Sequence, residues 1–414
     1  MESEIFTYIN ASARPGTGPM EDTRVAVESG ISVENWPTDA QSRALENYVA
    51  LEDATLITRL RDAGAALKGR TAMGELGLGL DGDTCGDALT KGLSDVALKI
   101  DTTGEARMAA AISGCFGFKP TYGLIPRAGL ISLIPSMECC GILSNSLEAI
   151  STTTRTMGGV DERDPSMDPD GIDQAMAGFD QSGPSQDDPL IVGVIRDWHT
   201  AMGLEDKEFK AAVKKINTAA GIEIKTVDIK DFSLARTVHN IIGTVEASSS
   251  AGRFDSVRYG HRTGASVKNW NEMYIHSRGE SFGPLVKAYL FQGGYFQYRD
   301  YNAFLDACRI RARLMASLEK ALESVDLIVL PVAAGAVVES EASNTVSGFY
   351  DTFSLTLLAN LTGNPSVSIP GAVSPGTTNG DAARKALQLI GPRFDDAGLL
   401  ARASRISDIL TGEV

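Results

Sequence analysis

Residues 99–123 read KIDTTGEARMAAAISGCFGFKPTYG. A short polar run, Asp101 to Gly104, leads into an alanine-rich segment that predicts a buried helix. A glycine just before a helix lets the chain turn sharply, and the first amide groups of the helix are then free to bind an anion. Such a turn presents the side chain that follows the glycine. Here that side chain is Glu105, an acid rather than a hydroxyl or a thiol.

The segments around this turn alternate between expected helices and strands. Residues 23–31 predict a strand, and residues 51–71 predict an amphipathic helix that ends at Gly64 and is followed by a short strand. Residues 87–104 repeat the order of helix, glycine and strand, and residues 302–324 predict a long helix before a buried strand. This rhythm predicts an α/β fold, with helices crossing between the strands of a largely parallel or mixed sheet.

The composition is that of an ordinary chain with a large core and an acidic surface. Of 414 residues, 43% are hydrophobic, and 53 acidic side chains face 38 basic ones, for a net charge of -15. That charge disfavours direct nucleic-acid binding through a broad basic face, although a partner subunit could still bind RNA. The stretch 161–189 is rich in Asp, Pro, Gly and Ser, which predicts a surface linker.

The cysteines and histidines form no pattern of ligands, so we expect no cofactor and no metal centre of these residues. The cysteines have no CxxC spacing and predict reduced, mostly buried thiols of an intracellular protein: Cys85, Cys115, Cys139, Cys140 and Cys308. The histidines have no HxH or HExxH spacing and are expected to be ordinary surface or core residues: His199, His239, His261 and His276.

No signal for secretion or for a membrane span is apparent. The first thirty residues lack the basic start and apolar run of a signal peptide, and no apolar run approaches the roughly 18 residues of a span. We therefore expect a cytoplasmic protein without membrane contact. An organelle is the alternative if a transit peptide has been removed.

Several long motifs, in their order and spacing, resemble the amidase signature family. They are LEDATLITRLRDAGAALKGRTAMGEL (51–76), GCFGFKPTYGLIPRAGLI (114–131), VDLIVLPV (325–332), LLANLTGNPSVSIPG (357–371) and LQLIGPRFDD (387–396). Within the family, EASSSAGRFDSVRYGHRTG (246–264) and FGPLVKAYLFQGGYFQY (282–298) most resemble the A subunit of the tRNA-dependent glutamine amidotransferases.

The resemblance implies a fold and a chemistry. The fold is one α/β/α domain, residues 1–414, around a large mixed sheet. In the mechanism, a serine attacks an amide carbonyl, a second serine relays the proton, a buried lysine is the base, and peptide N–H groups of the glycine-rich turn hold the oxyanion. The A subunit releases ammonia from glutamine, and its partner subunits use that ammonia to amidate mischarged tRNA.

All three catalytic positions carry acids in this chain. The family pattern Asp-Thr-Gly-Gly-Ser-x-Arg stands here as DTTGEAR, so Glu105 takes the place of the nucleophile. The bridging serine precedes the nucleophile by about 24 residues, which leads to Asp81. The lysine of the pattern VAVKD is replaced by Glu28 in VAVES, and a loop that walls the family's site, between residues 79 and 80, is largely missing.

If the fold is kept, these three acids lie within hydrogen-bonding distance of one another. Like charges that close cannot all ionise cheaply, so one carboxyl would hold a proton or meet a cation. The cluster could do acid/base or nucleophilic work. It could also bind magnesium or calcium, with Asp83 and Asp101 adding oxygens. Alternatively, the shortened loop simply exposes the acids to water.

The resemblance also implies residues that contact substrate. They are Thr102, Thr103, Gly104, Arg107, Arg311 and Asp351. Arg107 is expected to brace the turn. Arg311 and Asp351 fall where the glutamine-using protein grips the carboxylate and the amine of the amino acid. The alternative for Arg311 is a solvated basic helix face shared with Arg309 and Arg313.

Three hypotheses follow. The favoured one is a pseudoenzyme: an amidase-fold binding or scaffold subunit that has lost the triad and holds protein partners, with a small amide or amino acid as the candidate ligand. The second is an enzyme repurposed around the carboxylates. The third is a working C–N (amide) hydrolase whose nucleophile is Thr102, Thr103 or Cys85. Acidic surroundings should raise the pKa of the Cys85 thiol and so make it a weaker nucleophile.

Overall fold

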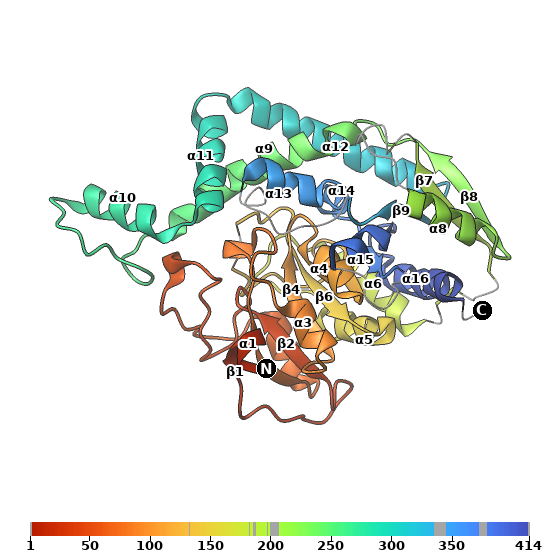
Figure 1. Ribbon diagram of the computed structural model, residues 1–414, viewed down its shortest axis with the longest axis horizontal. Helices are drawn as coiled ribbons and strands as arrows, with labels where there is room; N and C mark the ends of the chain where they lie inside the picture. Colours follow the sequence, from red (N-terminus) through yellow and green to blue (C-terminus); the bar gives the residue numbers. More distant parts are fainter. Residues whose placement is uncertain are drawn as a thin grey trace.

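One mixed β-sheet runs through the molecule (Figure 1). The computed structural model describes residues 2–412 except 132, 182, 185–187, 197, 199–206, 335–344 and 372–378. Within these residues the strand order is β1-β3-β2-β4-β6-β5-β10-β11-β9-β7-β8. The strands are β1 Phe6–Ile9, β2 Arg24–Glu28, β3 Ala66–Thr71, β4 Val96–Asp101, β5 Phe116–Lys119, β6 Cys139–Ser144, β7 Leu190–Ile195, β8 Ile222–Val227, β9 Leu327–Pro331, β10 Ser366–Ile369 and β11 Leu387–Ile390. The expected α/β fold is confirmed.

Parallel and antiparallel pairs occur in the same sheet. β2 is parallel to β3 and β4, and β7 is parallel to β8 and β9, whereas the central strands pair antiparallel. The helices are α1 Glu2–Ile5, α2 Thr55–Asp62, α3 Cys85–Thr90, α4 Glu105–Ser113, α5 Leu147–Met157, α6 Pro169–Asp180, α8 Lys207–Asn217, α9 Ala235–Ser250, α10 Trp270–Ser281, α11 Pro284–Tyr298, α12 Tyr301–Leu322, α13 Val346–Phe353, α14 Leu357–Thr362, α15 Asn379–Lys385 and α16 Asp396–Thr411.

Small residues let α4 lie close to the sheet. A Cβ on Gly141 would come within 2.4 Å of the Ala106 Cβ, and one on Gly117 within 2.5 Å of the Ala110 Cβ. The alanine-rich sequence therefore forms the buried helix that was expected, because larger side chains would lift α4 away from β5 and β6. This packing fixes the turn before α4 against the end of β4.

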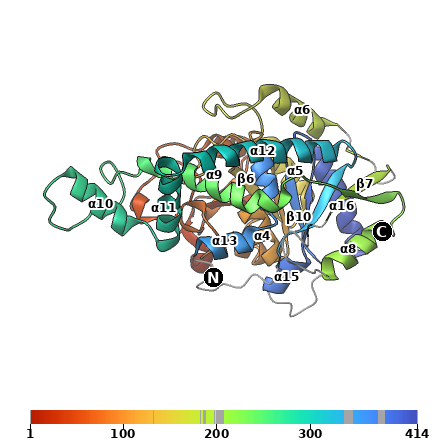
Figure 2. The same cartoon turned by 90° about the horizontal axis from the view of Figure 1, so that it is seen from above.

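The segment 161–189 is not a simple linker. It contains α6, which starts at Pro169 after the N-cap Asp168, whose side chain accepts a hydrogen bond from the Gly171 amide. Ile172 and Ala175 of this helix are buried in a small apolar cluster at one edge of the molecule (Figure 2). The prediction of a linker was wrong here because Asp, Pro and Gly also form a helix start.

The helical part above the sheet in Figure 1 ends in a projecting arm. α9, α11, α12 and α14 contact one another, and α10 extends away from them (Figures 1 and 2). In the described part of the chain no helix is both long and apolar enough to cross a bilayer. The five cysteines are unpaired; four are buried and Cys308 is half-buried, as expected.

Candidate functional site

The turn between β4 and α4 requires its glycine. Gly104 has φ +127°, and a Cβ at this position would lie 2.2 Å from the Thr356 Oγ1. Its neighbours are tied down as well, because the Thr356 hydroxyl donates to the Thr103 carbonyl at 2.5 Å. The turn is therefore a rigid structure in which successive backbone N–H groups point the same way.

The carboxylate of Glu105 folds back into this turn. Its Oε2 accepts hydrogen bonds from the amides of Thr102 (2.8 Å), Thr103 (2.7 Å) and Gly104 (3.1 Å). Its Oε1 accepts from the Thr103 hydroxyl at 2.5 Å. The amide groups that would hold an oxyanion are thus occupied by an anion of the chain itself, a concave amide site of the kind that binds phosphate or carboxylate.

Burial shapes the electrostatics of this carboxylate. Glu105 is 1% exposed. Burial and the nearby charge of Asp101 raise the pKa of Glu105, and the hydrogen bonds from Thr103 and Thr102 oppose that rise. Because Oε2 of Glu105 already accepts hydrogen bonds from three amides, it cannot accept another from a ligand in the plane of the turn.

Arg107 braces the turn, as expected, and its guanidinium is engaged by protein groups. It is fully buried and binds both oxygens of Asp101, at 3.2 and 3.0 Å. It also donates to the Thr356 carbonyl and to the side chains of Gln388 and Asn360. Burial alone would raise the pKa of Asp101, but Arg107 holds it below its usual value. The predicted substrate contact of Arg107 has no support in this geometry.

A chain of neutral groups supports the other side of the turn. His239 Nε2 lies 3.1 Å from the Thr102 carbonyl oxygen, and its Nδ1 lies 2.9 Å from the Tyr350 hydroxyl, which lies 2.6 Å from the Tyr289 hydroxyl. Burial lowers the pKa of His239 from 6.5 to about 4, so the ring is neutral. Since a carbonyl only accepts, Nε2 carries the proton and Nδ1 accepts from Tyr350.

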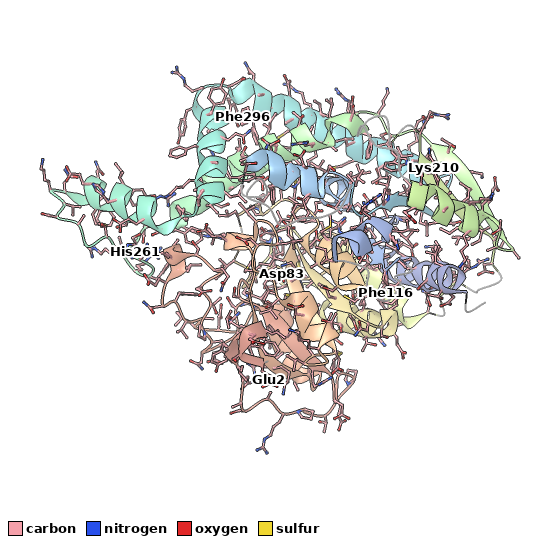
Figure 3. All side chains as sticks on the ribbon, viewed as in Figure 1. Glu2, Asp83, Phe116, Lys210, His261 and Phe296 are labelled. Atoms are coloured by element: carbon pink, nitrogen blue, oxygen red, sulfur yellow. The ribbon has the colours of Figure 1, made fainter. Side chains whose placement is uncertain are left out.

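A second charged cluster involves the neighbouring strands β2 and β4. The two strands are parallel and in register, so Glu28 lies beside Lys99. The Lys99 ammonium binds the Glu28 carboxylate at 2.5 Å and the Asp83 carboxylate at 2.7 Å, and the Ile100 amide donates to Glu28 at 2.7 Å. Asp83, labelled near the centre of Figure 3, also accepts from the Cys85 amide. We call Glu28, Lys99 and Asp83 the buried ion cluster.

The ion cluster does not provide a free base. Burial raises the pKa of Glu28 from 4.5 to about 7, although Lys99 opposes this. For Lys99, burial alone would lower the pKa, but Asp83 and Glu28 together raise it well above 10.5. An amine needs a lowered pKa to accept a proton near neutral pH, so Lys99 is held in its charged form.

The three acids predicted to cluster are not brought together. Asp81 lies exposed in the turn before α3, and within the described residues no hydrogen bond or ion pair joins it to Glu28 or Glu105. Glu28 and Glu105 have separate partners. The expectation was wrong because the buried Lys99 pairs with Glu28 and Asp83, and Asp81 stays outside this cluster. Among the described residues no group of three or more His, Cys, Asp or Glu side chains could hold a metal ion.

The other residues considered as nucleophiles or ligands are also engaged. Cys85 is fully buried, its Sγ lies 2.9 Å from the Thr71 Oγ1, and burial together with Asp83 raises the pKa of its thiol, as expected. Thr102 and Thr103 are buried in the turn. His199 lies outside the described residues.

Arg311 and Asp351 have separate protein partners in this structure. The half-buried Arg311 donates to the Leu361 carbonyl and to the side chain and carbonyl of Ser136. It is therefore not part of a solvated face, unlike the exposed Arg309. Asp351 is exposed on α13 and pairs with Arg236. Their predicted grip on an amino acid stays a prediction.

Sequence reasoning missed three contributors. Lys99 had a signal, since a lysine inside the otherwise apolar run VALKI needs a charged partner when buried. His239 and Tyr350 had none, because they are 111 residues apart and each fits an apolar helix face.

Comparisons with known proteins agree with this architecture. The amidase family model matches residues 9–86 and 85–400. The chain is 31% identical to the A subunit of glutamyl-tRNA(Gln) amidotransferase from Natronomonas pharaonis, over 94% of this chain and 96% of that one. It is 32% identical to the protein of the same name from Paraburkholderia phymatum, over 94% of this chain and 84% of the other.

Solved structures show the same fold. The A subunit of glutamyl-tRNA(Gln) amidotransferase from Thermotoga maritima superposes with a TM-score of 0.73 at 21% identity, over 99% of this chain and 88% of that one. A 6-aminohexanoate cyclic dimer hydrolase superposes with a TM-score of 0.75 at 18% identity, over 99% and 90%. The resemblance of the motifs is thereby confirmed, and the chain belongs to the amidase family.

Proposed function

We propose that this chain is a non-catalytic member of the amidase family that serves in binding or as a scaffold within an assembly. The observation that carries the proposal is the Glu105 carboxylate bound to the amides of Thr102, Thr103 and Gly104. In the family mechanism these amides stabilise a transient oxyanion. A permanent anion there excludes the acyl oxygen of a substrate by charge and by volume.

The buried ion cluster supports the same proposal. An amidase needs an amine that can take a proton from a nucleophile, and Lys99 is kept charged by Glu28 and Asp83. Glu28, which takes the position of the lost lysine, thus serves the stability of the fold together with Asp83. Loss of the whole proton path, and not of one residue, favours a role without chemistry.

The partner is proposed from the relatives. The curated relatives carry the name of one subunit of the glutamyl-tRNA(Gln) amidotransferases, so they work in an assembly. By extension, this chain holds one or more protein partners, with a small amide or amino acid as a ligand. Because the net charge of -15 disfavours nucleic-acid binding by this chain, we assign any such binding to the partner.

A turnover assay tests the proposal. Ammonia release from glutamine, asparagine and a simple amide is measured for the wild type and for Glu105→Ala, whose turn has lost the carboxylate. We expect no release above the level of the variant. Turnover that is present in the wild type and absent from Glu105→Ala would refute the proposal. Affinity purification from the native source with mass spectrometry is expected to recover a stoichiometric partner.

One contact favours a second candidate, an amide hydrolase that uses Thr103. The Thr103 hydroxyl donates to Glu105 at 2.5 Å, as a nucleophile does to its general base. We rank it second because both side chains are buried, and Thr103 is 0% exposed. A covalent adduct of an acyl-type probe on Thr103 would favour the amide hydrolase over the non-catalytic role.

A further inference from the structure

An unpartnered helix face lies at the end of the molecule that carries the arm. α11 packs on α9 through Val286, Tyr289 and Gly293, and a Cβ on Gly293 would lie 1.9 Å from the Thr244 carbonyl oxygen. This close approach fixes which side of α11 faces inward. The other side faces solvent, beside α10 (Figure 1).

The outward face has the spacing of a helix–helix seam. Its exposed residues follow one another at intervals of 4, 3, 4 and 3: Pro284, Ala288, Phe291, Tyr295 and Tyr298. A strict alternation of three and four is the pattern of a two-helix seam, whereas a helix that packs on a globular core shows a wider apolar stripe. Figure 3 labels Phe296, the neighbour of Tyr295 on this helix. We call these five residues the α11 seam.

The α11 seam exposes a large part of the area that one side of a protein interface buries. Phe291, Tyr295 and Tyr298 are 78%, 55% and 84% exposed. At roughly 200 Å² for each aromatic side chain, they offer on the order of 400 Å² of aromatic surface. One side of a standard protein interface buries about 800 Å², so the aromatic side chains of the α11 seam alone offer about half of that area. Aromatic residues of this kind are enriched at interface cores.

We propose that the α11 seam binds the same seam of a second copy of this chain, with the two helices antiparallel. The seam is small at its start, at Pro284 and Ala288, and large at its end, at Tyr295 and Tyr298. Antiparallel pairing sets the small end of each copy against the large end of the other, and Phe291 meets its own copy at the two-fold axis. The shape is thus complementary to itself.

Charge does not oppose this pairing. Residues 251–300 carry seven lysines and arginines against four aspartates and glutamates, in a chain that is acidic overall. Within α11 itself, the one ionisable side chain of Lys, Arg, Asp or Glu type is Lys287. None of the five residues of the α11 seam is charged, so two copies can meet along it without setting like charges in direct contact. The inference does not depend on whether the chain is catalytic.

Solution mass tests the proposal. At tens of micromolar, analytical ultracentrifugation of the full chain should give twice the 43.9 kDa chain mass. Phe291→Asp should shift it to the single-chain mass with an unchanged circular dichroism spectrum. Leu51→Asp, at a position that is 84% exposed but outside the seam, should leave the mass unchanged. A wild type that stays monomeric, or a dimer that survives Phe291→Asp, would overturn the proposal.

Crosslinking tests the direction of the helices. In a Cys308→Ser background, Phe291→Cys should form an intermolecular disulfide on mild oxidation, since the axis brings residue 291 against its copy. Tyr298→Cys is the matched control: seven residues from the axis in each copy, its thiols stand roughly 20 Å apart, too far for a disulfide. Crosslinking of Tyr298→Cys, or none for Phe291→Cys, would overturn the antiparallel arrangement.

Discussion

Removing the carboxylate from the turn should open an anion site that a small carboxylate refills. In Glu105→Ala, the amides of Thr102, Thr103 and Gly104 lose their acceptor. A buried donor left without a partner costs about 1–3 kcal/mol, so three of them should lower the free energy of unfolding by roughly 3–9 kcal/mol. Formate has the shape of the missing group, and at 100 times its dissociation constant it should restore about 2.7 kcal/mol.

The assay is urea denaturation with and without formate, with chloride at the same ionic strength as the salt control. Glu105→Gln is the matched variant, because its amide fills the space without a charge and leaves no room for formate. We expect formate to stabilise Glu105→Ala alone. A Glu105→Ala protein as stable as the wild type, or the same formate effect in all three proteins, would refute the account of the turn.

Three further changes probe the turn and the buried ion cluster. The pKa of Glu28 rises from 4.5 to about 7 on folding, so the folded protein binds a proton more tightly than the unfolded chain does. The free energy of unfolding should therefore fall by about 3 kcal/mol as the pH rises through this range. Glu28→Gln should lack this loss, and the difference between the pH profiles of unfolding of wild type and variant isolates the effect. Lys99→Met should cost about 3–5 kcal/mol at pH 8, because it leaves the carboxylates of Glu28 and Asp83 buried without a cation; unchanged urea denaturation would contradict the ion cluster. Gly104→Ala should cost about 3 kcal/mol or more through its φ of +127° and its steric clash, whereas Gly114→Ala, with φ +71° and no neighbour within 4 Å, should cost about 1 kcal/mol by the same assay.

Much of the fold could be predicted from the sequence because its signals are local. Glycines marked the ends of the predicted helices, and the alternation of helices with apolar strands indicated the α/β class. The alanines of α4 predicted a buried helix. The one local signal misread was Asp168–Pro169, a helix start inside a polar segment. Composition alone cannot separate a loop from a capped helix.

The site was predictable in its position and not in its contacts. The pattern DTTGEAR located Glu105 at the turn, but its return to the amides depends on a side-chain torsion that no pattern encodes. Counting along the chain chose Asp81, whereas the lysine of a neighbouring strand selected Asp83. Such pairings are decided by which strands are adjacent, and therefore need the fold first.

The central claim is that the turn before α4 presents no reactive nucleophile, because its amides and its hydroxyl serve a permanent carboxylate. Labelling of the native chain with a fluorophosphonate probe, followed by peptide mass spectrometry, tests this most directly. We predict no adduct anywhere in residues 81–107. An adduct on Thr102, Thr103 or Cys85 that disappears on denaturation before labelling would contradict the claim.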